Sequence, residues 1–341
     1  GDFALASLLT GPALPAAWAL TGVGFAAVLS RSGHRSQDAS LAALGLGGHI
    51  ALALLSAYLQ APPSAIGATG EELLGPALGL AATAAGCFTS ARLTDDRAWR
   101  GWLDAVGLLV AFYLTAVTLD GAALVVAWAF EAAALAHIAR RTRDAVAAIG
   151  APVHLAAAAG LALLAVAPPA ALVDGLEDPV AAAAALGAVA VAALRLADLW
   201  RAEPVLRWGV GLGSAVTLLY LGSAELVTQY QPGTEQLVGD IALSVRQQGQ
   251  LLLSMLWSLV GVAGLLVGLR ADRRPLRLGA LALLGVAIAK VFVYDLSALT
   301  SVYRVVSFIA LGLFLLLGAF AHQRLRRSPL PDLRSVPPAL R

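Results

Sequence analysis

The sequence predicts an all-α fold: a polytopic transmembrane helix bundle of about eleven helices, grouped in tandem four-helix repeats of which the last is one helix short. The composition is 59% hydrophobic and 13% charged, with a mean hydropathy of +0.80, which is typical of multi-pass membrane proteins and excludes a soluble globular domain. Neither strand-like alternation nor barrel-type turns interrupt the apolar stretches. The backbone polar groups must therefore bond within helices.

Each apolar stretch of roughly 17–25 residues is predicted to cross the membrane once. The predicted spans are 12–30, 40–60, 72–91, 102–119, 121–139, 146–168, 179–199, 206–229, 249–269, 277–294 and 303–322.

Arginine placement predicts the orientation. Arginine-rich segments follow every second span, from Arg31 to the tail that ends at Arg341, and the loops between them are acidic instead. Because basic loops stay in the cytoplasm, the N-terminus is expected outside and the C-terminus inside. Lysine is almost absent beside abundant alanine, leucine, glycine and arginine, a bias typical of a high-GC bacterial genome. We therefore expect the bacterial cytoplasmic (inner) membrane. The start at Gly1 without methionine, and an N-terminus outside before a hydrophobic helix, lead us to expect a processed chain or one part of a longer product.

An internal repeat is also predicted. Trp18, Trp128 and Trp257 each begin a helix that ends about 13 residues later in an arginine. Further matches join the first two copies: Arg92 with Arg195, Asp95 with Asp198, Trp102 with Trp208, and Tyr113 with Tyr220. An even number of crossings per copy makes the copies parallel; chance matching of Ala/Leu-rich helices is the alternative. The predicted domains are repeat 1 (1–120), repeat 2 (121–230), repeat 3 (231–322) and a cytoplasmic Arg/Pro-rich tail (323–341).

Lys290, the single lysine of the chain, lies within an apolar run. An ionisable group inside a span costs about 2.5–3.5 kcal/mol on insertion scales, so it needs a partner or water. Glu225 is expected at a comparable depth, and with Asp295, Arg304 and Arg246 these residues would form an outward-facing polar pocket. A structural ion pair, or a lysine that reaches the outer interface by itself, is the alternative.

Glu131 is expected near the middle of its span, where the matching repeat positions hold Thr21 and Val260. It is either a proton-coupling site or a protonated carboxyl that bonds a neighbouring helix. Asp104 is expected to face Arg100 or Arg97. Glycines spaced for close helix crossings are Gly75 with Gly79, Gly264 with Gly268, and the series Gly209, Gly211 and Gly213.

No cofactor, metal site or catalytic residue is expected. The histidines within spans lie on separate helices, without the spacing of a haem or metal site, and the single cysteine excludes a multi-cysteine cluster. Nucleophile elbows, phosphate-binding loops and nucleic-acid-binding modules are missing from the sequence.

The C-terminal segment Lys290-Val-Phe-Val-Tyr-Asp295-Leu-Ser-Ala-Leu, followed by Tyr303-Arg304-Val-Val-Ser-Phe-Ile-Ala-Leu-Gly-Leu, resembles the C-terminal motif of a bacterial membrane family, domain of unknown function 2339 (DUF2339). The helices that begin near Leu253 and Trp128 are similar to that family's repeated helices. Members are typically longer, with a cytoplasmic N-terminal coiled coil and more helices. The resemblance implies an integral membrane protein and no particular activity.

Three classes of function stay open. The first is a non-enzymatic membrane subunit or scaffold of a bacterial envelope complex, because the strongest signals concern packing and topology. The second is a transporter for an envelope or lipid-linked solute, which the repeats and the intramembrane charges favour. The third is a membrane-embedded enzyme. The expected partners are membrane lipids, other membrane subunits or an upstream part of the same product; no nucleic acid is expected.

Overall fold

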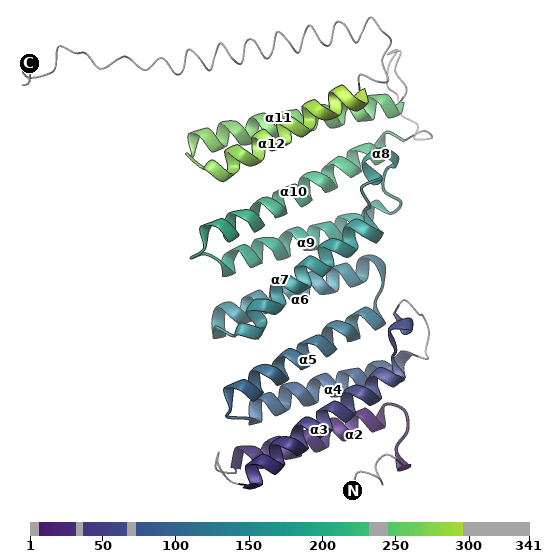
Figure 1. Cartoon of the computed structure of the whole chain (residues 1–341). Coiled ribbons are helices and arrows are strands. Elements are labelled where there is room, and N and C mark those ends of the chain that lie inside the picture. The colour runs from purple at the N-terminus through teal and green to yellow at the C-terminus, as the bar shows by residue number, and fades with distance from the viewer. Residues whose placement is uncertain (1–6, 32–36, 67–72, 232–244, 296–341) are drawn as a thin grey trace, which may run out of the picture. The chain divides into compact units, whose positions relative to one another are not determined.

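The computed structural model describes residues 7–31, 37–66, 73–231 and 245–295 (Figure 1). The chain forms two compact units, Gly1–Gly239 and Asp240–Arg341. The described residues of both units are helical and contain no strand, which confirms the predicted all-α class. In the labels that follow, η denotes a short 3₁₀ or π turn.

The first unit begins with a quartet of long helices. Its members are α2 (Ala13–Arg31), α3 (Gln37–Gln60), α4 (Leu74–Leu93) and α5 (Arg97–Thr118), with the 3₁₀ turn η1 (Pro63–Ala65) after α3. Helix α2 packs along α3 and α4, and α4 packs along α5, so α2 and α4 lie between α3 and α5 in the order of packing (Figure 1).

A second quartet follows in the same unit. Its helices are α6 (Gly121–Thr142), α7 (Ala145–Leu161), α9 (Pro179–Leu199) and α10 (Pro204–Gln229), with the π turn η3 (Ala162–Val166) and the short α8 (Ala171–Asp174) between α7 and α9. Helix α6 packs along α7 and α9, and α9 packs along α10. The order of packing partners is the one found in the first quartet. The tandem repeat itself stays a prediction.

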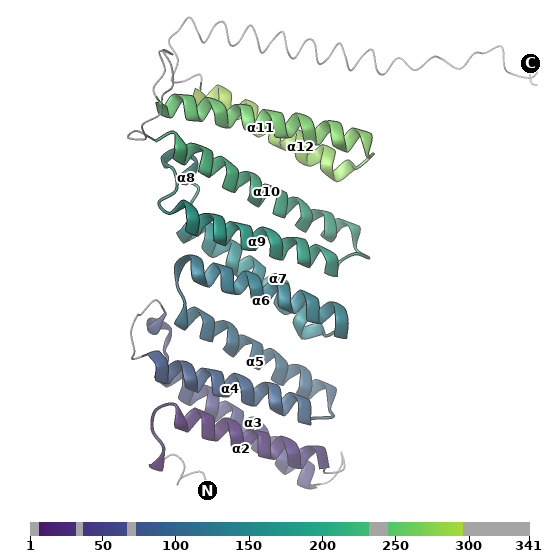
Figure 2. The ribbon, with the colours of Figure 1, turned by 180° about the vertical axis from the view of Figure 1, so that it is seen from behind.

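The second unit contains the antiparallel pair α11 (Val245–Arg270) and α12 (Arg274–Lys290), followed by the π turn η4 (Val291–Asp295) (Figure 2). The two helices approach closely where α11 carries glycine. A Cβ added at Gly261 would lie 2.7 Å from the Leu284 side chain, and one added at Gly268 would lie 3.0 Å from the Arg277 backbone nitrogen.

Ten helices of the described residues are long and apolar enough to cross a membrane, and they coincide in order with the first ten predicted spans. The eleventh predicted span, 303–322, and the tail, 323–341, lie outside the described residues. Most predicted boundaries differ from the structure by a few residues, because charged residues at the arginine-rich ends extend the helices beyond the apolar core.

Several helices begin at an aspartate that caps them. Asp96 accepts hydrogen bonds from the Ala98 and Trp99 nitrogens at the start of α5, and Asp144 and Asp178 cap α7 and α9 in the same way. A carboxylate at this position satisfies backbone N–H groups that have no partner within the helix. These aspartates therefore mark where the chain re-enters a span.

Small residues set the helix spacing inside the first unit. A Cβ on Gly86 of α4 would lie 2.7 Å from the Ala19 Cβ of α2, and one on Gly79 would lie 2.8 Å from Pro15. Close backbone approach of this kind holds membrane helices together where lipid removes the hydrophobic driving force. The predicted crossings at Gly75/Gly79 and Gly264/Gly268 are confirmed.

The glycine series in α10 behaves differently. A Cβ on Gly209, Gly211 or Gly213 would meet no atom of the described residues within 4 Å. Within the first unit, the predicted close crossing at this series is therefore not found. Small side chains permit a close approach but do not by themselves bring a neighbouring helix to these positions.

Candidate functional site

The most prominent polar pair inside the spans joins α6 to α7. The Oε2 atom of Glu131 lies 3.4 Å from the Nε2 atom of His154. The His154 side chain is 3% exposed and that of Glu131 is 26% exposed. Neither of these two atoms has a hydrogen-bond partner among the described residues. Glu131 is thus not surrounded by apolar groups alone: it faces a titratable ring on the next helix.

Aromatic side chains enclose the imidazole of this pair. The Phe112 ring of α5 stands edge-to-face against His154, with ring centroids 4.8 Å apart, and stacks on Trp128 of α6 at 4.4 Å. The Trp128 Nε1 atom donates to the Thr115 hydroxyl at 3.0 Å. Because Trp128 precedes Glu131 by three positions, both side chains occupy the same face of α6. The pair therefore lies where the first quartet meets the second.

Lys290 lies at the C-terminal end of α12 and bonds to α11. Its ammonium donates to the Gln250 backbone carbonyl at 3.0 Å and to the Ser254 hydroxyl at 2.9 Å. Gln250 and Ser254 are one helical turn apart on α11, so the two acceptors lie on the same face of that helix. Beside them lies an apolar groove of about 530 Å³ that Ser254, Met255 and Val291 help to line.

The other members of the predicted polar pocket lie in different units or outside the described residues, so the pocket itself stays a prediction. Glu225 belongs to the first unit, where its Oε1 accepts a hydrogen bond from Gln229 at 3.4 Å. Arg246 lies in the first turn of α11, Asp295 ends η4 with its side chain outside the described residues, and Arg304 is outside them entirely. The pairing of Lys290 with Glu225 stays a prediction.

At the arginine-rich ends of the helices the ion pairs differ from those predicted. Asp104 was expected opposite Arg100 or Arg97, yet its Oδ1 lies 3.6 Å from Arg92 of α4. Arg100 also lies near enough to interact electrostatically with Asp104, so the expectation is confirmed in part. Arg92 was not expected; it approaches because α4 and α5 are antiparallel and the end of one lies beside the start of the other. In the second quartet Asp198 lies 3.6 Å from Arg140 and 3.0 Å from Arg201.

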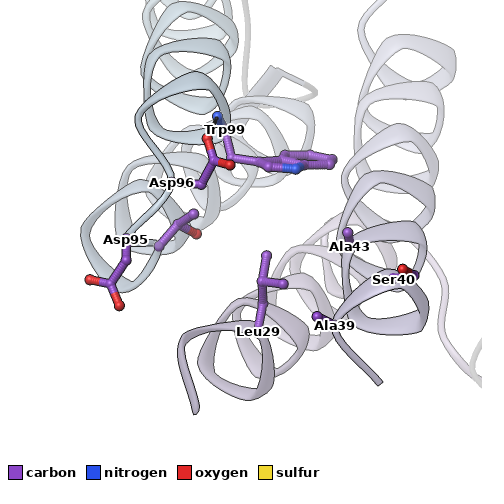
Figure 3. A pocket seen from close by; sticks show the side chains of 8 residues that line it. Leu29, Ala39, Ser40, Ala43, Asp95, Asp96 and Trp99 are labelled. Atoms are coloured by element: carbon purple, nitrogen blue, oxygen red, sulfur yellow. Dashed lines mark hydrogen bonds between the residues drawn. The ribbon is translucent and has the colours of Figure 1, made fainter. Parts of the chain in front are cut away.

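A hollow of about 200 Å³ opens at the same end of the first quartet (Figure 3). The Trp99 ring extends from α5 toward the start of α3, where Ala39, Ser40 and Ala43 lie, and Leu29 of α2 forms another wall. Asp96, at the rim, already accepts the helix-capping hydrogen bonds. Asp95 is exposed and turns away from the hollow in this view. Ser40 and Thr94 add to its partly polar lining.

In each quartet, at the end away from the arginines, a tyrosine hydroxyl donates a hydrogen bond to a carbonyl of the loop that follows an earlier span. The Tyr113 hydroxyl of α5 donates to the Ala61 carbonyl at 2.7 Å. In the second quartet the Tyr220 hydroxyl of α10 contacts the Ala167 carbonyl at 2.8 Å and the Pro168 carbonyl at 2.7 Å. Ala61 and Ala167 each begin an Ala-Pro-Pro segment, and prolines provide no N–H group to complete a helix end. Each tyrosine therefore supports the loop at which the preceding span ends.

Sequence reasoning missed the partners of both intramembrane charges. For His154, a signal is present: Gly45-x-x-x-His49 and Gly150-x-x-x-His154 repeat the same spacing, and each imidazole Nδ1 lies within 2.8 Å of the carbonyl of its glycine. For Lys290, the signal is the pair Gln250 and Ser254, which lie four positions apart within the apolar sequence of α11. Among residues 7–31, 37–66, 73–231 and 245–295, no group of three His, Cys, Asp or Glu side chains could hold a metal ion.

Comparison with known proteins supports the motif in the C-terminal part of the chain. No curated protein and no solved structure matches the sequence. Residues 176–325, which include α9 to α12, match the model of a family described as "Predicted membrane protein (DUF2339)". That stretch contains both halves of the motif around Lys290 and Tyr303. The resemblance inferred from the motif is thereby confirmed for this stretch, which is similar to the DUF2339 predicted membrane proteins.

Proposed function

We propose that this multi-pass membrane protein is a non-enzymatic subunit or scaffold of a bacterial envelope complex. The observation that carries the proposal is that several polar side chains within the spans bond to another helix or to a loop and not only to their own helix. Ser214 of α10 donates to the Ala190 carbonyl of α9 at 2.9 Å, the Leu176 nitrogen donates to Thr228 at 2.8 Å, and Lys290 bonds across α11 and α12. In lipid such bonds stabilise helix contacts by roughly 0.6 kcal/mol on average.

The orientation is part of this proposal. Within the first unit, consecutive antiparallel helices place the turns after α2, α4, α6 and α9 at one end, and these turns carry the arginines. We place that end in the cytoplasm of a bacterial inner membrane, with the N-terminus outside. The same reasoning places the turn between α11 and α12 in the cytoplasm.

The test of a scaffold is the state of the protein in gently extracted membranes. A subunit is expected to migrate on a native gel with a fixed partner, and mass spectrometry of that band should return the same stoichiometry from independent preparations. Deleting the gene should lower the abundance of that partner in the membrane, and restoring the gene should recover it. A protein that migrates alone, with no membrane protein lost on deletion, would contradict the proposal.

A transporter is the second candidate, and the Glu131–His154 pair favours it. Ionisable groups inside a span mark the paths of ions and substrates in many membrane proteins. A transporter coupled to protons should dissipate a pH gradient imposed on proteoliposomes faster than vesicles that contain Glu131→Gln. If the wild-type protein and Glu131→Gln dissipate the pH gradient at equal rates, the transporter is contradicted. The proposal of a scaffold is not affected by that result.

A further inference from the structure

The hydrogen bond at one ring nitrogen defines which protonation states His154 adopts. Its Nδ1 lies 2.8 Å from the Gly150 carbonyl oxygen, four residues earlier in α7. A carbonyl oxygen only accepts, so Nδ1 must carry the hydrogen. In the neutral ring the other nitrogen, Nε2, is then an acceptor; in the charged ring both nitrogens donate.

That second nitrogen faces Glu131 in a buried setting. If the ring were neutral and Glu131 ionised, two acceptors would oppose each other at 3.4 Å without any other partner. If both groups were protonated, a positive charge would remain in an apolar interior without compensation. A single proton resolves both problems, because either the carboxyl donates to Nε2 or the imidazolium donates to the carboxylate. Closing the gap by about 0.5 Å brings the two atoms to an ordinary hydrogen-bond distance.

The neighbouring charges do not neutralise this pair. The titratable side chains on the described elements packed against α6 and α7 are Arg97, Arg100, Asp104 and Tyr113 of α5, His137, Arg140 and Arg141 of α6 itself, and Arg195 and Asp198 of α9. Asp104 pairs with Arg92, Tyr113 bonds to a loop carbonyl, Arg100 bonds to the Thr94 carbonyl, and Arg140 lies beside Asp198. The arginines lie at the ends of their helices, and His137 is exposed.

We propose that Glu131 and His154 form an intramembrane proton-binding site that holds one proton between the carboxylate and the imidazole. His154 is enclosed by Phe112 and its neighbours, whereas Glu131 is partly exposed, so the carboxyl group is the more accessible member of the pair. The matching place in the first quartet holds Thr21, whose hydroxyl bonds to the Ala17 carbonyl at 2.8 Å. The site is thus a property of the second quartet. It goes beyond the scaffold proposed above and does not depend on it.

Infrared difference spectroscopy of the purified full chain in lipid nanodiscs tests the site directly. Spectra recorded across a pH series in H₂O and D₂O should show a titrating carboxyl C=O band that shifts on deuteration. The band should be absent in Glu131→Gln and should titrate at a pH at least about one unit away in His154→Phe, since a pKa moves by one unit for each 1.36 kcal/mol of lost interaction. Thr21→Val, the matched change in the first quartet, should leave the band unaltered.

Glu131→Gln is expected to fold, because its amide can donate to the neutral His154 Nε2 without titrating. Protection of the buried Cys87 thiol against a membrane-permeant thiol reagent verifies the fold in each variant. If wild type and Glu131→Gln give the same titrating band, the site does not exist as described. The same conclusion follows if His154→Phe lowers thermal stability but leaves the titration unchanged, because the pair would then be structural only. A titrating band without any proton movement across vesicles supports the site and counts only against the transporter.

Discussion

The crossing of α2 and α4 allows a quantitative test of the packing. Gly86 lies on the buried face of α4, directly against Ala19 of α2, which is 2% exposed. A Cβ at position 86 would lie 2.7 Å from the Ala19 Cβ and 3.4 Å from its Cα. Carbon atoms pack best at about 3.5–4.0 Å, so Gly86→Ala requires the helices to separate by roughly 0.8 Å or more. The backbone of Ala19 leaves no flexible side chain to move instead.

Two opposing effects determine the size of the change. Overpacking a close-packed interior by a methyl group costs about 1–3 kcal/mol. Replacing glycine by alanine within a helix gains at most about 1 kcal/mol. The clash is the larger effect, and we expect Gly86→Ala to lower the free energy of unfolding by about 1–2 kcal/mol. Gly187 of α9 is the matched control: a Cβ there would meet no atom of the described residues within 4 Å, so Gly187→Ala should gain stability or leave it unchanged.

The single cysteine, Cys87, allows the change in stability to be measured. Cys87 follows Gly86 in α4, is fully buried and packs with Leu46, Ile50 and Leu103. Heating the protein in detergent with a dye that fluoresces on reaction with thiols reports when this part of the first quartet opens. The midpoint should fall for Gly86→Ala and should not fall for Gly187→Ala. Equal midpoints for the two variants would refute the close crossing of α2 and α4.

Three further outcomes are expected. In a cysteine-free background, a cysteine at Gly233 should react with a membrane-impermeant thiol reagent in intact cells and one at Ala271 should not; the reverse pattern would overturn the orientation. Tyr220→Phe should lower the free energy of unfolding by about 0.5–1.5 kcal/mol, because the carbonyls after η3 lose their donor, and an unchanged midpoint would show that water replaces the hydroxyl. If Lys290 pairs with Glu225, Lys290→Met should cost about 3–5 kcal/mol and a second change, Glu225→Gln, should recover much of it; a silent Lys290→Met would exclude the pairing.

The spans were predictable because their cause is local. A stretch of about 20 apolar residues must bond its own backbone in lipid, whatever surrounds it. The ten described helices therefore appear where the hydropathy predicts them. Arginines at alternate turns and capping aspartates such as Asp144 likewise act within a few residues of their own position, so the ends of the helices could be predicted to within a few residues.

Side-chain partners were not predictable in the same way, because they depend on the rotation of each helix and on which helices are neighbours. Glu131 is isolated in the sequence, and only the packing of α7 along α6 places His154 opposite its carboxyl group. Asp104 pairs with Arg92, in addition to its electrostatic interaction with Arg100 of its own helix, because α4 runs antiparallel to α5. Lys290 of α12 bonds to Gln250 and Ser254 of α11, which lie forty and thirty-six positions earlier in the sequence. The sequence alone determined that these charges lie within a membrane, whereas their chemistry was decided by tertiary contacts, since an interaction between two helices requires the geometry of both.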